Sequence, residues 1–125
     1  DASKNDMITA AFKSICYQTR DITELLIQNN IKINSLNVDG GMAANKTFCQ
    51  LLSDSLSVNI LKPVNIESTA LGACIVAQIS QGENIDNIKS RIEDKYEPQD
   101  NLKDFLETDY RLWKNYIEKT ISNIK

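Results

Sequence analysis

Residues 36–45 read LNVDGGMAAN, the stretch of the chain with the clearest local structural signals. Leu36 and Val38 flank a polar residue, and such alternation indicates a short strand. The acidic residue and two glycines at 39–41 end that strand sharply, because adjacent glycines favour turns. Apolar residues then recur at helical spacing over about 42–56. The stretch therefore predicts a strand, a tight turn and a helix in immediate succession.

A second strand is expected directly after this helix. Residues 58–61 are mostly apolar, and Lys62-Pro63 closes the run. A strand that returns to the same sheet through a helix lies parallel to the first and crosses over right-handed. The segment thus predicts a helix-rich α/β fold built on a short parallel βαβ unit.

Three further helices are expected around this unit. Residues 6–30 carry an apolar stripe, with Asp6 as a candidate N-cap and two asparagines as a stop. Residues 67–81 are apolar on almost every side, which is typical of a buried helix. The last helix starts near Asp100 and carries an apolar stripe to the end of the chain.

The stretch between the last two helices, residues 84–98, is polar and broken, with a short helix expected around Ile85, Ile88 and Ile92. Two short strands are few beside four substantial helices. A parallel pair leaves two unpaired edges, and parallel sheets usually contain more strands. We therefore expect further strands from an upstream segment or a partner chain, and self-association through the exposed edge.

Composition restricts the class of protein. The 125 residues are 42% hydrophobic and 25% charged, with a net charge of -3, as in ordinary globular domains. The basic residues are scattered along the sequence and indicate no basic patch that would bind nucleic acid. No apolar run approaches the roughly 20 residues that cross a bilayer, and the polar start predicts no secretion signal. A cytoplasmic chain without nucleic-acid or membrane partners is expected.

Residue types that could carry catalysis or bind metal are sparse. The cysteines, Cys16, Cys49 and Cys74, lie on apolar helical faces, so we expect buried, reduced thiols. The chain has no histidine, which excludes the usual zinc sites and Ser-His or Cys-His nucleophiles. Glu107 and Asp109 lack the spacing of one helical face, so no metal site is predicted there.

The glycine turn is the one local feature that favours ligand binding. Gly40 and Gly41 have no Cβ, so a ligand can approach their backbone. The first N–H groups of the following helix point outward without partners, and the Asn45 amide lies one turn into that helix. Taken alone, a double glycine at this place is more often a simple tight turn, and Asp39 a turn former. The stretch matches neither the P-loop nor the Gly-x-Gly-x-x-Gly pattern.

Two further sets of residues, one charged and one aromatic, each allow two interpretations. Arg20-Asp21 could be a site pair, but a helix-surface or inter-helix contact is favoured. Tyr110, Trp113 and Tyr116 could stack on a base, but their spacing on one helical face favours packing.

Several blocks together resemble the FGGY family of carbohydrate kinases, and in particular its glycerol kinases. The family pattern is a strand, Asp-Gly-Gly, an asparagine four residues later, and a downstream Gln-x-x-[Ala/Ser]-Asp. Tyr-Gln-Thr-Arg-Asp on the first helix is the part most similar to the glycerol kinases. The resemblance covers essentially the whole chain. The matching blocks are residues 14–21, 36–45, Gln50, Ser53-Asp54, 69–73 and Trp113-Lys114.

The resemblance implies a fold and a site. FGGY kinases have two actin-like, ribonuclease H-like domains around a cleft, and the C-terminal one holds the adenosine of ATP partly through the Asp-Gly-Gly loop. Residues 1–125 would be the distal part of that C-terminal domain, without its first strands and without the N-terminal domain. Gly40 and Gly41 would offer backbone to the nucleotide, and Asn45 would hydrogen-bond near the adenosine. Gly72 would let its helix pack close to the loop.

The resemblance also implies a reaction: transfer of a phosphoryl group from MgATP to glycerol, giving glycerol 3-phosphate and ADP. Such catalysis is mostly positioning and charge neutralisation. The family's aspartate base, glycerol-binding residues and first phosphate loop lie upstream of the region matched here. We therefore expect no catalytic residue and no metal ligand in residues 1–125, Mg²⁺ and glycerol held mainly by other parts of the protein, and no turnover by this chain alone.

Two alternatives remain. The parent could be another FGGY sugar kinase, for example one acting on a pentulose, although the Tyr-Gln-Thr-Arg run at 17–20 favours a glycerol kinase. The chain could instead be a non-catalytic half-domain that acts through a partner chain.

Overall fold

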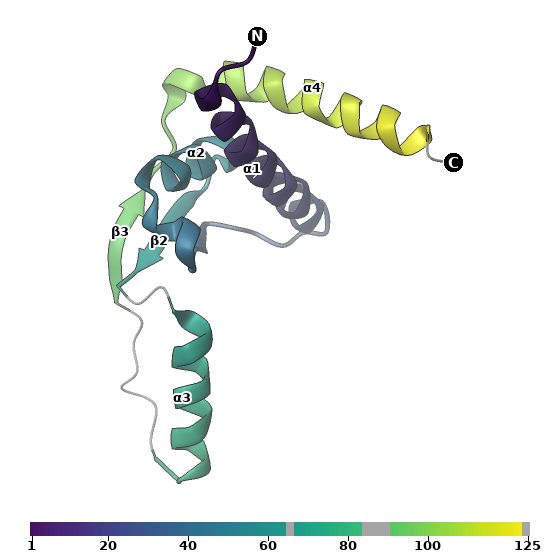
Figure 1. Cartoon of the computed structure of the whole chain (residues 1–125). Coiled ribbons are helices and arrows are strands. Elements are labelled where there is room, and N and C mark those ends of the chain that lie inside the picture. The colour runs from purple at the N-terminus through teal and green to yellow at the C-terminus, as the bar shows by residue number, and fades with distance from the viewer. Residues whose placement is uncertain (65–66, 84–90, 124–125) are drawn as a thin grey trace.

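The computed structural model describes residues 1–64, 67–83 and 91–123. Within these residues, no helix combines the length and apolar character that crossing a membrane requires. Figure 1 shows the arrangement of the elements. They are, in chain order, α1 (Lys4–Gln28), β1 (Ser35–Asn37), the 3-10 helix η1 (Gly41–Ala44), α2 (Lys46–Leu56), β2 (Asn59–Pro63), α3 (Ser68–Ser80), β3 (Ile92–Tyr96), the 3-10 helix η2 (Asp100–Leu102) and α4 (Lys103–Ser122).

The sheet has the order β1-β2-β3. β1 and β2 are parallel, with Leu36 opposite Ile60, which confirms the predicted βαβ unit. β3 runs antiparallel to β2, with Ile60 opposite Tyr96 and a register shift between Lys62 and Pro63. The described sheet is therefore mixed and three-stranded, and β2 is the middle strand with a paired neighbour on each side.

The expectation of a short helix in 84–98 is wrong where it can be tested. Ile92 is the first residue of β3, whereas Ile85 and Ile88 lie outside the described residues. The central residues of β3 are charged, so its sequence lacks a clean apolar alternation. Pairing across the sheet favours the strand instead, since Lys62 Nζ lies 2.6 Å from Glu93 Oε2. Charged side chains also suit an edge strand.

The core lies between α1, α2 and β2. Cys16, Cys49 and Ile60 are fully buried there, and Phe48 and Leu52 complete the cluster. The predicted burial of the first two cysteines is confirmed. Burial raises the pKa of the Cys16 thiol to about 12 and also raises that of Cys49, so both remain protonated and act as small apolar groups.

The predicted burial of the helix at 67–81 is wrong in this structure. None of the residues of α3 is buried, Val76 is 67% exposed, and Cys74 is exposed. Figure 1 shows α3 extending away from the sheet and the other helices. An all-round apolar surface indicates burial only when other elements surround the helix. The expected close packing at Gly72 is also wrong, because a Cβ there would meet no atom within 4 Å.

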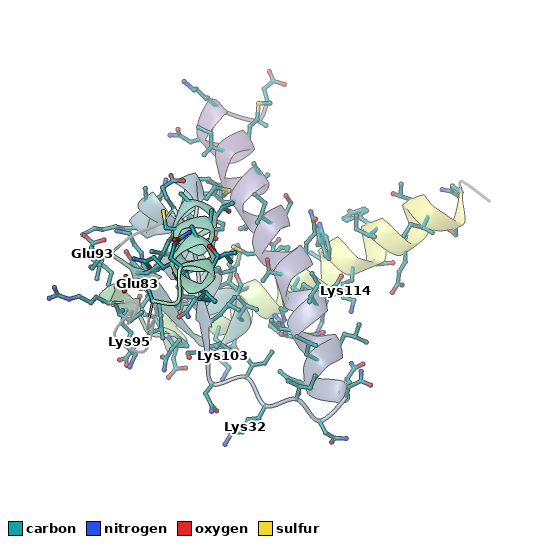
Figure 2. The ribbon with its side chains drawn as sticks, turned by 90° about the horizontal axis from the view of Figure 1, so that it is seen from below. Lys32, Glu83, Glu93, Lys95, Lys103 and Lys114 are labelled. Atoms are coloured by element: carbon teal, nitrogen blue, oxygen red, sulfur yellow. The ribbon has the colours of Figure 1, made fainter. Side chains whose placement is uncertain are left out.

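Helices α1 and α4 are joined by ion pairs. Arg20 Nη2 lies 2.5 Å from Glu107 Oε2, and Lys13 Nζ lies 2.7 Å from Asp109 Oδ2. Lys114, which lies where α4 leaves α1 in Figure 2, has its Nζ 3.2 Å from Asp21 Oδ1. The expected inter-helix role of Arg20-Asp21 is confirmed.

Aromatic rings fill the space between these ion pairs. Tyr110 is 3% exposed, and its ring centroid lies 5.5 Å from that of Tyr17 and 6.1 Å from that of Trp113. The Tyr110 hydroxyl donates to Asp21 Oδ1 at 2.5 Å. Burial is the main cause that raises the Tyr110 pKa, and the hydrogen bonds to the Asp21 and Glu24 carboxylates raise it further. Packing is therefore the role of Tyr110 and Trp113, whereas Tyr116 is 68% exposed and does not share it.

Candidate functional site

The glycine turn joins β1 to η1 and has one position that requires glycine. Gly40 has φ +78°, in the region that other L-residues rarely adopt. The Ala43 N–H donates to the Gly40 carbonyl at 3.0 Å, which closes the first turn of η1. The helix expected from residue 42 thus begins as a 3-10 turn, and α2 starts only at Lys46.

Asn45 is the N-cap of α2, so its expected place one turn into the helix is wrong. Its Oδ1 accepts a hydrogen bond from the Phe48 backbone N–H at 3.1 Å. Asparagine is among the residues that best satisfy the unpaired N–H groups of a first turn. Asn45 is exposed, and within the described residues its Nδ2 makes no hydrogen bond. The amide therefore has one end fixed by the helix and one end available.

A hollow of about 380 Å³ opens beside the turn. Its walls come from α1, β1, η1 and α2 and are mostly apolar. Gly41 lines it and is exposed, and a Cβ added at Gly41 would meet no protein atom within 4 Å. The lining residues are Thr19, Leu36, Asn37, Val38, Asp39, Gly41, Met42, Ala43, Phe48 and Leu52.

The structure brings only part of the predicted site to this hollow. Gly41 is in its wall, whereas Gly40 shapes the turn and Asn45 lies just beyond, at the start of α2. Sequence reasoning missed Thr19, which belongs to α1, and Met42. The Tyr-Gln-Thr-Arg run did single out the segment that contains Thr19, but nothing in its pattern indicated that it faces the glycine turn.

The second half of the motif has a structural role. Gln50 Nε2 donates to the Glu97 carbonyl at 2.8 Å, and Ser53 Oγ donates to the Tyr96 carbonyl at 3.1 Å. Asp54 Oδ1 accepts from the Gln99 N–H at 2.8 Å. These contacts attach the end of β3 and the residues after it to α2, and they lie apart from the hollow at the glycine turn.

The acidic residues between α1 and α4, Glu107 and Asp109, form ion pairs that hold the two helices together. Residues 1–64, 67–83 and 91–123 contain no group of three or more His, Cys, Asp or Glu side chains that could hold a metal ion. Burial tends to raise the Asp109 pKa, but hydrogen bonds from Lys13 and Tyr17 outweigh it, so the pKa is lowered. The Glu107 pKa is lowered by its hydrogen bond with Arg20.

Comparison with known proteins identifies the family. Residues 1–80 match the C-terminal domain of the FGGY family of carbohydrate kinases, and the chain belongs to that family. Curated relatives include glycerol kinases. That of Fusobacterium nucleatum is 36% identical over 123 residues, which is 95% of this chain and 25% of that protein. That of Marinomonas sp. is 38% identical over 91 residues, which is 71% of this chain and 18% of that protein.

Solved structures agree with the fold. A xylulose kinase from Lactobacillus acidophilus has a TM-score of 0.78 at 22% identity, covering 96% of this chain and 25% of that one. Plasmodium falciparum glycerol kinase with ADP has a TM-score of 0.71 at 26% identity, covering 96% of this chain and 26% of that one. The fold is the distal part of an actin-like, ribonuclease H-like domain, and the chain spans about a quarter or less of its matched relatives.

Proposed function

We propose that this chain is the nucleotide-binding end of an ATP-dependent glycerol kinase. Residues 1–125 would then be the distal part of its C-terminal domain, and the whole protein would transfer a phosphoryl group from MgATP to glycerol. The observation that carries the proposal is the open backbone of Gly41 at the mouth of a mostly apolar hollow. Glycerol kinases among the relatives support the choice of substrate.

The dimensions and lining of the hollow suit the adenosine part of ATP. Small-molecule sites have mostly apolar walls, volumes from about 300 Å³ upward and few polar groups, and this hollow of about 380 Å³ has that character. Gly41 would let the nucleotide approach the backbone, since it presents no Cβ. Asn45 would donate its Nδ2–H group to the adenosine while its Oδ1 still caps α2.

Gly40 has a different role from Gly41. Its positive φ makes the turn that directs residues 41–44 toward the hollow. A side chain at Gly40 would strain the backbone, whereas an alanine at Gly41 would meet no protein atom within 4 Å. Gly40 therefore positions the site, and Gly41 contacts the ligand.

Mg²⁺ and the chemical step belong to other parts of the proposed enzyme. The described residues hold no carboxylate cluster for a metal. When bound, Mg²⁺ would neutralise the phosphate charge during transfer. The chain's own contribution is to bind and orient the nucleotide, and we expect residues 1–125 alone to show no turnover.

Another FGGY sugar kinase is the second candidate, since the fold is shared with a xylulose kinase. The Tyr17-Gln18-Thr19-Arg20 run and the glycerol kinase relatives favour glycerol. A non-catalytic half-domain is the third candidate, and the intact turn and Asn45 cap argue against it.

Calorimetric titration of ATP and ADP into the 125-residue chain tests the nucleotide role. We expect saturable binding that Asn45→Ser weakens about three- to tenfold, the effect of losing one hydrogen bond of ordinary strength. Serine keeps a good N-cap, so the thermal stability of this variant should match the original. Asn45→Ala is the less informative change, because it also removes the cap and destabilises by about 0.5–2 kcal/mol.

Gly41→Ala is the matched second variant. It should fold normally, because there is room for a Cβ, yet it should weaken ATP and ADP binding by blocking close approach to the backbone. If both variants bind nucleotide as well as the original chain, the glycine turn is not the nucleotide site. Catalysis by the longer parent protein on glycerol, compared with a pentulose, separates the first two candidates.

A further inference from the structure

A second and larger hollow, of about 530 Å³, lies away from the glycine turn and shares none of its lining residues. It is bounded by the first half of α1, the outward face of α2 and the chain between β3 and η2. Phe12, Leu51, Tyr96 and Leu102 supply its apolar walls. A hollow of this volume can enclose a small organic molecule.

Asp54 lies in the wall of this hollow and is only 7% exposed. Its Oδ1 accepts two hydrogen bonds, from Gln50 Nε2 at 2.9 Å and from the Gln99 N–H at 2.8 Å. Its Oδ2 accepts none from the described residues. Among those residues no lysine or arginine forms an ion pair with Asp54, which leaves its carboxylate without a counter-charge and its Oδ2 open to the hollow.

This charge is not balanced by the one lysine that lines the hollow. Lys46 and Asp54 both belong to α2 and are eight residues apart, which places their backbones about 12 Å apart along the helix. A lysine side chain is too short to span that distance along the helix. A carboxylate oxygen beside apolar walls attracts a cationic hydrogen-bond donor more strongly than one in open water, so Oδ2 is a suitable acceptor for a bound cation.

The lining favours an organic cation over a metal ion. Calcium and magnesium take several oxygen ligands, and the described residues offer no group of three metal-binding side chains. The aromatic rings of Phe12 and Tyr96 instead suit an ammonium or guanidinium group, which aromatic faces attract. The apolar walls suit the carbon chain that carries such a group.

We propose that this hollow binds a small organic molecule with a guanidinium or ammonium group at one end and an anionic group at the other. The cationic group donates to Asp54 Oδ2, and its carbon chain lies against Phe12 and Leu51. The anionic end faces Lys46, which is exposed and forms no ion pair within the described residues. Because Asp54 also holds the Gln99 backbone, occupancy of the hollow would stabilise the attachment of the β3–η2 segment to α2.

L-arginine and L-citrulline are matched probes for this site. They have nearly the same shape, but citrulline carries a neutral ureido group where arginine carries a guanidinium. Titrations are followed by amide chemical shifts of the full 125-residue chain. We expect L-arginine to shift residues of the larger hollow with saturation, and L-citrulline to bind at least about tenfold more weakly, since hydrogen bonds to charged groups are the stronger ones.

Asp54→Asn is the decisive variant, since asparagine retains the Oδ1 acceptor for Gln99 and removes only the charge. It should keep the fold and lose L-arginine affinity at least about tenfold. Asp100→Asn is the control, because Asp100 is exposed and does not line the hollow. The proposal is overturned if L-arginine gives no saturable shifts at the hollow, or if Asp54→Asn and Asp100→Asn bind it equally well.

Discussion

Replacing Ile60 with alanine should lower the free energy of unfolding by about 2–5 kcal/mol, the range for large-to-small changes in a packed core. Ile60 is fully buried in the middle strand, with Leu36 and Tyr96 opposite it on the two neighbouring strands. Alanine would leave a cavity in the cluster that joins α1 and α2 to the sheet. Chemical denaturation followed by circular dichroism measures the change.

Val76→Ala is the matched control, because Val76 is apolar and β-branched but 67% exposed on α3. Its effect should stay within about 0.5 kcal/mol, as for most surface changes. If Ile60→Ala does not fold, Ile60→Val should still show a loss of about 0.5–1.5 kcal/mol. Equal effects at Ile60 and Val76 would mean that the core does not lie around β2.

Tyr110→Ala should destabilise the chain by about 3–5 kcal/mol, as other buried aromatic truncations do, and release α4 from α1. The ring packs against Tyr17 and Trp113, the Arg20 guanidinium lies 4.0 Å from its centroid, and its hydroxyl donates to Asp21. One substitution removes all of these contacts. Amide hydrogen exchange of α4, measured with the denaturation midpoint, reports both effects.

Tyr116→Ala is the control on the same helix, since Tyr116 is 68% exposed. It should change stability and α4 protection little. Tyr110→Phe separates packing from hydrogen bonding and should cost about 0.5–1.5 kcal/mol, the net contribution of an ordinary hydrogen bond, because its partners Asp21 and Glu24 are partly exposed and water can replace the lost donor. If Tyr116→Ala releases α4 as readily as Tyr110→Ala, the contact between the helices has been assigned to the wrong residues.

Local sequence rules predicted the elements whose signals are local. Alternation at Leu36 and Val38, followed by two glycines, gave the strand and turn, and helical periodicity gave the four long helices to within a few residues. The inter-helix role of Arg20-Asp21 was also predictable, because a charged pair on an otherwise ordinary helix most often binds a neighbouring element. Each of these inferences depends on residues close together in the chain.

The remaining features depend on contacts between distant residues. Strand β3 is charged in its middle and is specified by its pairing with β2, where Lys62 lies opposite Asp94 and forms an ion pair with Glu93. The exposure of α3 depends on which elements surround it, and periodicity cannot report that. Asn45 is an exception, because its cap is a local hydrogen bond to the Phe48 N–H; helical periodicity does not show the preceding 3-10 turn, which moves the start of α2 to Lys46. Thr19 lines the smaller hollow only because α1 packs beside the glycine turn, which lies far from it in the sequence.

The most direct test of the proposed nucleotide site is a titration of ADP into the isotope-labelled 125-residue chain, followed by amide chemical shifts. We expect saturable shifts centred on Gly40, Gly41 and Met42, extending to Asn45 and the rest of the smaller hollow. Saturable shifts confined to β3 and α4, or no shifts in a folded sample, would contradict a nucleotide site at the glycine turn.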